Sequence, residues 1–385
     1  MADSRAVRSF LTAAFLVVVC GVGLTQVAIE LSQGQRPQFT ELFLQAPTKA
    51  NFRAFDSDLE NKCWLSHRLR PWVQYVQFLI LKSAGDKALP GRAGWFFYRP
   101  AVQYLVQPWP HGSDGSRDNI FSAIVSFRDQ LAKRGVRLLV VPVPNKASIY
   151  PEMLARRAAR AKRPVNLKTL EIISRLRQVQ VEVIDLSAVF SRARLGLLPG
   201  DDTKFYLSQD THWSPEGVRL AAGTVADRIL ELKWAQKGSA RYSLKPVTIT
   251  RYGDILEMMQ VPQIERLFVP QWLNCTQVVD AESGELYRDD PNSEILIIGD
   301  SFLRIYSRDE PGAAGFIEHL AYELGLGLTS LVNDGGASTL VRQQLSRKPA
   351  LLTGKKLVVW EFVERDIRFG TEGWQDVPLP NRAEK

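Results

Sequence analysis

The chain has 385 residues, of which 23% are charged, 45% hydrophobic and 10% aromatic, and its formal net charge is +8. This composition is typical of a globular protein and excludes wholesale disorder, collagen-like repeats and a membrane protein with many spans. The positive excess is small for this length. Without an RNP, zinc-finger or helix-turn-helix signature it does not indicate a nucleic-acid partner.

The first predicted element is an uncharged apolar segment, Ser9 to Ile29, which lies between Arg8 and Glu30. At about 1.5 Å per residue, a helix over this segment reaches about 31 Å, close to the hydrocarbon thickness of a bilayer. A cleaved signal peptide usually has a shorter apolar region, so we expect a retained signal anchor, with cleavage as the alternative. Arg5 and Arg8 precede the span, so the positive-inside rule places only the short tail in the cytoplasm.

The cysteines add one open question. Cys20 lies in the apolar segment, which leaves Cys63 and Cys275. In an oxidising compartment these two could form a disulfide, and they could equally be two unrelated buried thiols.

From residue 116 onward, segments of helical periodicity alternate with continuous apolar runs. Such runs predict strands that are buried on both faces, because a strand covered on one face alternates apolar and polar residues. The runs are Val136–Val143, Val181–Leu186, Glu294–Ile298, Leu328–Val332 and Lys355–Phe362. Helices are predicted between them, one with Ser214 as N-cap and Pro215 as its first residue. This order predicts an α/β fold, a parallel sheet with helices on both faces.

The domain organisation follows from these changes of pattern. Residues 235–292 break the alternation and are predicted to be an inserted, partly β segment. We therefore expect a tail and signal anchor at 1–34, an aromatic-rich extension at 35–115, the α/β domain at 116–370 and a C-terminal tail at 371–385.

Polar residues at the strand ends predict the chemistry, because ligands of such sheets bind at the carboxyl ends of the strands. Ser301 follows the run that ends at Ile298, so it is expected at a strand-to-helix turn, where its backbone N–H can stabilise an oxyanion. Asp210 and His212 precede the helix capped by Ser214. Asp210 can hold one ring nitrogen of His212 and leave the other to act as base, which predicts a Ser301–His212–Asp210 catalytic triad. The other histidines lack metal-binding spacing, so no metal site is predicted.

Two resemblances rest on these residues. Gly299-Asp300-Ser301, with Asp210 and His212, resembles the SGNH-hydrolase superfamily in a circularly permuted order, which implies a flavodoxin-like sheet. More closely, the chain resembles the alginate O-acetyltransferase family of the AlgJ/AlgX type. The resembling stretches are Gly91–Tyr98, Val140–Pro151, Asp210–Pro215, Gly299–Phe302 and Trp360–Arg365.

The family resemblance implies an exported enzyme that acetylates a polysaccharide, with a single-pass anchor in the inner membrane and the catalytic domain in the periplasm. It also implies a membrane-bound O-acyltransferase partner as acetyl donor, since cytoplasmic acetyl-CoA is not available there. No coenzyme site is visible in the sequence, so no cofactor is predicted.

The oxyanion hole is less well defined. The resemblance places its glycine at Gly335. The superfamily's next block supplies an asparagine, but this chain has Glu361 and Phe362 near that place, and an ionised carboxylate cannot donate a hydrogen bond. Either the hole consists of backbone N–H groups alone, or another side chain substitutes. The candidate substitutes are Asn145, Lys146, Tyr306 and Arg365.

Two alternative functions stay open at this point. The same triad with water as acceptor would make a carbohydrate acetyl esterase, and a vestigial triad would leave a non-catalytic glycan-binding component of an export complex. The sequence does not identify the polysaccharide.

Overall fold

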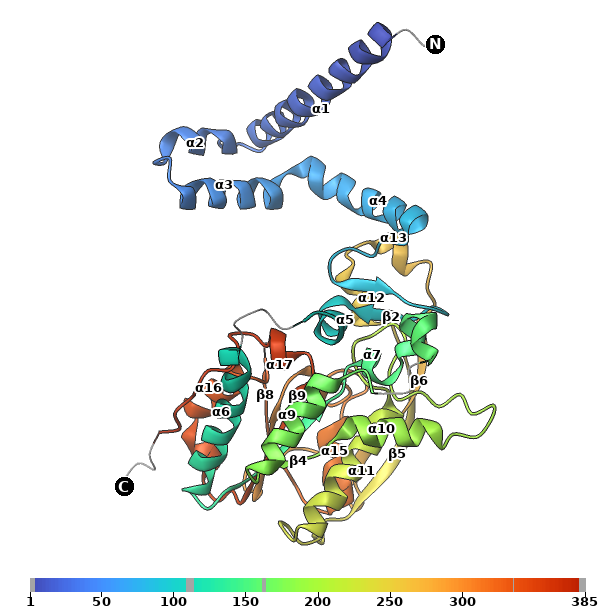
Figure 1. The fold of residues 1–385 in the computed structure, drawn as a ribbon, viewed down its shortest axis with the longest axis vertical. Coiled ribbons are helices and arrows are strands. Elements are labelled where there is room, and N and C mark those ends of the chain that lie inside the picture. The colour runs from blue at the N-terminus through green and yellow to red at the C-terminus, as the bar shows by residue number, and fades with distance from the viewer. Residues whose placement is uncertain (1–3, 109–113, 161–163, 335, 381–385) are drawn as a thin grey trace. The chain divides into compact units, whose positions relative to one another are not determined.

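The computed structural model describes residues 4–108, 114–160, 164–334 and 336–380. They fall into two compact units (Figure 1). The first unit comprises the chain up to Ser83 together with Gln260–Leu267, and the second comprises Ala84–Met259 and the chain from Phe268 onward.

The first unit consists, in its described part, of helices and connecting loops. Its longest helix is α1 (Ser4–Ser32), whose stretch Val7–Ser32 has a mean hydropathy of 2.1 and is long and apolar enough to cross a membrane. The predicted apolar segment is therefore a helix and a candidate anchor. The other helices are η1 (Gln38–Thr40), α2 (Glu41–Leu44), α3 (Lys49–Lys62), α4 (Trp64–Leu81) and α13 (Pro262–Glu265).

The second unit is built on a parallel five-stranded sheet with the order β4-β3-β9-β7-β8, which confirms the predicted fold. The strands are β3 (Arg137–Val143), β4 (Glu182–Val183), β7 (Ile295–Gly299), β8 (Thr329–Val332) and β9 (Leu357–Val363). Strand β4 is shorter than the predicted run because Asp185 leaves the strand to cap the next helix, where it accepts hydrogen bonds from the N–H groups of Ser187 and Ala188.

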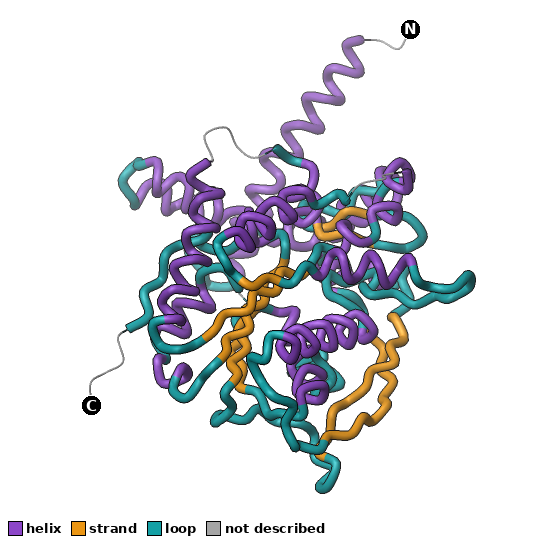
Figure 2. Tube along the Cα trace, turned by 60° about the horizontal axis from the view of Figure 1, so that its bottom comes forward, coloured by secondary structure: helices purple, strands orange, loops and turns teal. Residues whose placement is uncertain are grey.

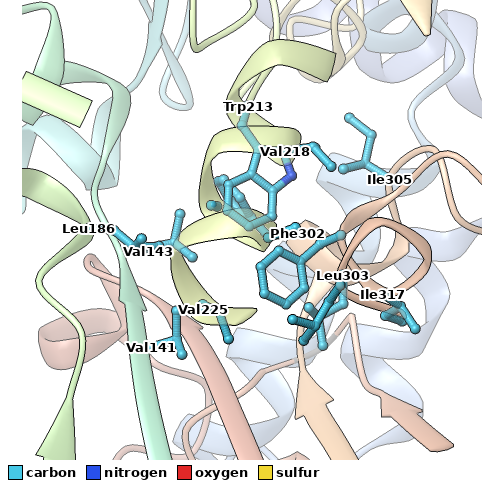
Figure 3. Close-up of a cluster of buried hydrophobic side chains, with 14 of the residues drawn as sticks. Val141, Val143, Leu186, Trp213, Val218, Val225, Phe302, Leu303, Ile305 and Ile317 are labelled. Carbon is cyan, nitrogen blue, oxygen red and sulfur yellow. The ribbon is translucent and has the colours of Figure 1, made fainter. Parts of the chain in front are cut away.

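Alternate residues of β3, β7 and β9 enter two separate cores, one on each face of the sheet. Val141 and Val143 of β3 lie in one core and Leu138 and Val140 in the other. Figure 2 shows the strands between two groups of helices, and Figure 3 shows part of the first core. The first core includes α10 (Leu186–Leu195), α11 (Pro215–Glu231) and α15 (Phe316–Leu324). The second includes α6 (Asp114–Ala132), α9 (Leu167–Gln178) and α16 (Leu340–Ser346).

The remaining elements surround the sheet. A long antiparallel hairpin pairs β5 with β6, from Tyr242 opposite Asp280 to Arg251 opposite Gln271. The elements are β1 (Ala88–Pro90), β2 (Phe96–Tyr98), α5 (Arg99–Val106), α7 (Lys146–Ile149), α8 (Pro151–Leu154), η2 (Arg156–Arg160), β5 (Tyr242–Arg251), α12 (Asp254–Met258), β6 (Gln271–Asp280), α14 (Ser301–Arg304), η3 (Pro349–Leu352) and α17 (Asp366–Phe369).

The three cysteines differ in exposure. Cys20 is exposed, Cys63 is half-buried and Cys275 is buried. Cys63 belongs to the first unit and Cys275 to the second, and the pairing that the sequence left open stays untested.

Candidate active site

Ser301 lies at the turn from strand β7 into helix α14. Its neighbour Asp300 caps the helix and accepts a hydrogen bond of 2.9 Å from the N–H of Phe302. The turn requires glycine at position 299, because a Cβ there would lie 2.3 Å from Oε2 of Glu361. Ser301 is the first residue of the helix, where a backbone N–H has no acceptor within the helix.

Asp210 and His212 lie on the loop that precedes α11. Ser214 caps this helix by accepting a 3.1 Å hydrogen bond from the N–H of Gly217, as the sequence pattern predicted. Nε2 of His212 lies 2.9 Å from Oγ of Ser301, and Nδ1 lies 2.7 Å from Oδ1 of Asp210. The structure thus brings the three predicted residues into one hydrogen-bonded chain.

The charges around this chain favour a basic imidazole. Burial would lower the pKa of His212, but the carboxylate of Asp210, with a smaller contribution from Asp254, outweighs it and leaves the pKa raised. Burial would likewise raise the pKa of Asp210, yet His212 and the guanidinium of Arg251 hold it well below its usual range. Asp210 is therefore ionised whenever His212 acts as a base.

Comparison with known proteins shows which family the chain belongs to. A family model described as an SGNH hydrolase-like domain of the acetyltransferase AlgX matches residues 88–364. The chain belongs to this family. The predicted family resemblance and the SGNH-like fold are both confirmed.

The relatives within the family carry names from alginate biosynthesis. The "probable alginate O-acetylase AlgJ" of Pseudomonas putida is 23% identical over 379 residues, which cover 94% of this chain and 90% of the relative. The "alginate biosynthesis protein AlgX" of Pseudomonas aeruginosa is 24% identical over 244 residues, 62% of this chain. The match spans only 48%, about half, of AlgX.

Among solved structures, the O-acetyltransferase domain of Pseudomonas putida AlgJ matches with a TM-score of 0.59 at 22% identity, over 73% of this chain and 92% of that domain. Pseudomonas aeruginosa AlgX matches with a TM-score of 0.54 at 20% identity, over 72% of this chain and 62% of that chain. At these identities the structures establish the shared fold.

In this family member the end of the β5–β6 hairpin and the residues after β5 support the Asp210–His212 loop. Oδ2 of Asp210 accepts hydrogen bonds of 3.1 Å from Nε of Arg251 and from the N–H of Asp254. In return, the carboxylate of Asp254 accepts bonds of 2.6 and 2.5 Å from the N–H and the hydroxyl of Thr211. Gly253 permits this approach, since a Cβ there would lie 1.9 Å from the carbonyl oxygen of Gln209.

Arg251 and Asp254 were not predicted as site residues. They lie about forty positions after Asp210 in a segment without a recognisable motif, and only the folded hairpin brings them to the loop.

Atoms of Asp210, His212 and Asp254 lie within 4.8 Å of one another, a grouping that could hold a metal ion. We interpret it as a hydrogen-bond network, because the guanidinium of Arg251 already forms an ion pair with Asp210 and its positive charge opposes the binding of a cation there.

Lys146, a predicted oxyanion donor, supports the same loop from another direction. Its buried Nζ lies 2.9, 3.0 and 2.7 Å from the carbonyl oxygens of Leu207, Ser208 and Asp210. Burial lowers the pKa of Lys146 to about 7. In its ammonium form Lys146 can donate one hydrogen bond to each of these three carbonyls, so it positions the loop.

Tyr306 and Asn145 are also engaged. The hydroxyl of Tyr306 donates a 3.2 Å hydrogen bond to the carbonyl of Trp213. The N–H of Asn145 donates to Glu364 at 2.7 Å, and its Nδ2 lies 3.5 Å from the carbonyl of Ala101. Gly335, the predicted oxyanion glycine, lies outside the described residues.

Arg365 differs from the other candidates. Its half-buried guanidinium lies 5.2 Å from the ring centroid of Tyr98 and 5.9 Å from that of Phe302, the residue after the serine. Its charge opposes protonation of His212, so it lies near the triad. No hydrogen bond or ion pair joins its side chain to another described residue.

Glu361 lies on β9, near the place where the resemblance predicted an asparagine. The side chain is fully buried, and Oε2 accepts a 3.0 Å hydrogen bond from the N–H of Asp300. Burial, and then the neighbouring carboxylate of Asp300, raise the pKa of Glu361 well above its usual value, which favours the neutral acid. Glu361 lies on β9, the strand next to β7, and its hydrogen bond from Asp300 stabilises the turn that carries Ser301.

Proposed function

We propose that this protein is a polysaccharide O-acetyltransferase that carries the acetyl group on Ser301. The observation that supports this most strongly is the continuous chain from Asp210 through His212 to Ser301, with hydrogen bonds of 2.7 and 2.9 Å. A serine paired in this way with an oriented histidine is an activated nucleophile.

In the first half-reaction, Nε2 of His212 takes the proton of Ser301 while Oγ forms a bond to the carbonyl carbon of an acetyl donor. The carbonyl electrons move onto oxygen and then return, which breaks the bond to the leaving group. The leaving group takes the proton from His212, and an acetyl ester of Ser301 remains. Asp210 stabilises the transient imidazolium and stays ionised.

The oxyanion of the intermediate needs donors close to Ser301. The backbone N–H of Ser301, at the first position of α14, is one such donor. The guanidinium of Arg365 is the second donor we propose, because no hydrogen bond or ion pair joins it to another described residue and it packs near the ring of Phe302. The first of these donors is positioned by the backbone and the second by its aromatic neighbours.

In the second half-reaction, Nε2 of His212 removes a proton from a sugar hydroxyl, whose oxygen forms a bond to the ester carbonyl carbon. The tetrahedral intermediate then collapses and breaks the bond to Oγ of Ser301, which takes the proton back from His212. The names of the relatives, from alginate biosynthesis and alginate O-acetylation, support a polysaccharide as the acceptor. An esterase would use water in this step and the same residues.

We further propose that α1 anchors the chain in the inner membrane and that the second unit works in the periplasm. Arg5 and Arg8 at the start of α1 favour this orientation. A membrane-bound O-acyltransferase partner would then be the acetyl donor.

The test is a product analysis. The purified chain is incubated with a chromogenic acetyl ester and a soluble oligosaccharide, beside Ser301→Ala and His212→Ala. Acetylated oligosaccharide that both substitutions abolish supports transfer. Free acetate as the sole product would support an esterase, and glycan binding with identical background turnover in all three proteins would support a binding component.

A further inference from the structure

Helix α4 carries an uncovered apolar stripe. The stripe consists of Leu69, Trp72, Val73, Val76 and Ile80, whose spacing of three, four, seven and eleven residues places them on one face of the helix. Between 48% and 73% of each side chain is exposed. Soluble proteins bury a face of this kind, so the stripe requires an apolar surface that lies outside the first unit.

The rest of α4 is arranged around the stripe. Phe78, which helical geometry places on the opposite face, is buried, whereas the stripe is exposed. Arg68 and Arg70 are exposed and flank the stripe on its two edges. Arginines beside an apolar face that contains a tryptophan are typical of helices that lie at the surface of a bilayer.

Hydrogen bonds tie the start of α4 to the end of α1. Oε1 of Gln26 accepts a 2.8 Å bond from the N–H of Trp64, the first residue of α4. Nε2 of Gln26 donates to Glu30 at 2.8 Å and to the carbonyl of Lys62 at 3.4 Å. Gln26 and Glu30 lie in the last turns of the candidate span Val7–Ser32, so α4 begins at the level where that span ends.

We propose that α4 lies in the headgroup layer of the membrane that α1 crosses, with the stripe toward the acyl chains and Arg68 and Arg70 at anionic lipid phosphates. This inference rests on the proposed anchor. Tryptophan favours this layer, which is apolar on one side and wet on the other, and Trp64 and Trp72 are both exposed on α4. The helix would thus fix the point at which the chain leaves the bilayer.

The test measures where the stripe lies in a lipid bilayer. The full chain, with its three cysteines replaced by alanine, is reconstituted into phosphatidylethanolamine–phosphatidylglycerol liposomes and spin-labelled through Val76→Cys or Ile80→Cys. Leu198→Cys is the matched control, an exposed apolar residue of the second unit. Val19→Cys reports on α1. Collision with oxygen, which enters lipid, is compared with collision with a water-soluble nickel chelate.

We expect labels at Val76 and Ile80 to be accessible to oxygen and protected from the chelate, and the label at Leu198 to show the reverse. Chelate accessibility at Val76 and Ile80 equal to that at Leu198 would overturn the proposal. Protection from both reagents would also overturn it, because a protein surface, such as a second copy, would then cover the stripe. An aqueous label at Val19 would refute the anchor itself. Acetyl transfer by Ser301 is measured separately and does not depend on these results.

Discussion

Replacement of Gly253 by alanine is the sharpest test of how the hairpin supports the triad. The new Cβ would lie 1.9 Å from the carbonyl oxygen and 2.1 Å from the carbonyl carbon of Gln209. Non-bonded atoms of this kind need about 3.5 Å, so hairpin and loop must separate by about 1.5 Å. The hydrogen bonds from Arg251 and Asp254 to Asp210, both 3.1 Å, would then exceed bonding distance.

The expected effect follows from those lost bonds. Two hydrogen bonds to a carboxylate contribute about 1.5 kcal/mol each at the lower limit, so the free energy of unfolding should fall by about 3 kcal/mol. A displacement of about 1 Å in a catalytic group costs about 100-fold in rate, and we expect kcat/KM toward a chromogenic acetyl ester to fall by about that factor.

Gly223→Ala is the matched control. Gly223 lies inside α11 with no atom within 4 Å of an added Cβ, so this substitution should leave activity unchanged and stabilise the helix by about 1 kcal/mol. Steady-state kinetics and thermal unfolding by circular dichroism measure both effects. If Gly253→Ala kept more than half of the wild-type kcat/KM in a folded protein, the hairpin would have no part in positioning the triad.

Three further predictions concern charge. Activity should fall as the pH drops through the raised pKa of His212, because the imidazole must be unprotonated to act as a base. Asp254→Asn removes a negative charge that raises this pKa, so it should move the acid limb of the kcat/KM profile to lower pH. An acid limb at the same pH in the variant would contradict this. Glu361→Gln should keep the hydrogen bond from the N–H of Asp300. In the wild type the folded state holds a proton on Glu361, and the unfolded chain releases this proton above about pH 4.3. The variant should therefore be more stable than wild type at pH 7 but not at pH 4. Urea unfolding at both pH values decides this, and equal stability at pH 7 would refute a neutral Glu361. Arg365→Met should lower kcat by about 100-fold with KM little changed if Arg365 binds the oxyanion, whereas a rise in KM alone would assign it to substrate binding.

The sheet was predictable from the sequence because its strands are buried on both faces. Continuous apolar runs such as Val136–Val143 arise only where both faces need apolar side chains, and this signal is local. Ser301 and His212 could be found for a related reason, since each stands at the end of a run or before a capped helix.

The supporting residues could not be found in this way. Arg251 and Asp254 reach Asp210 through the fold of the hairpin, and their own sequence surroundings carry no pattern. Lys146 comes soon after the end of a strand, as a catalytic residue would, so its sequence position does not reveal its role. Only the three carbonyl groups around its Nζ in the folded chain show that it holds the loop. Glu361 presented a polar residue at an expected site position, but its burial beneath the serine turn is a tertiary property.

Intact-mass measurement shows whether Ser301 carries the acetyl group. The full chain in detergent is mixed with a chromogenic acetyl ester, quenched in acid and weighed beside Ser301→Ala and His212→Ala, with peptide mapping of the modified species. We predict one added acetyl group on the peptide that contains Ser301 in the wild type and none in either variant. An equal acetyl gain in wild type and Ser301→Ala, with the fold intact by circular dichroism, would show that Ser301 does not carry the acetyl group.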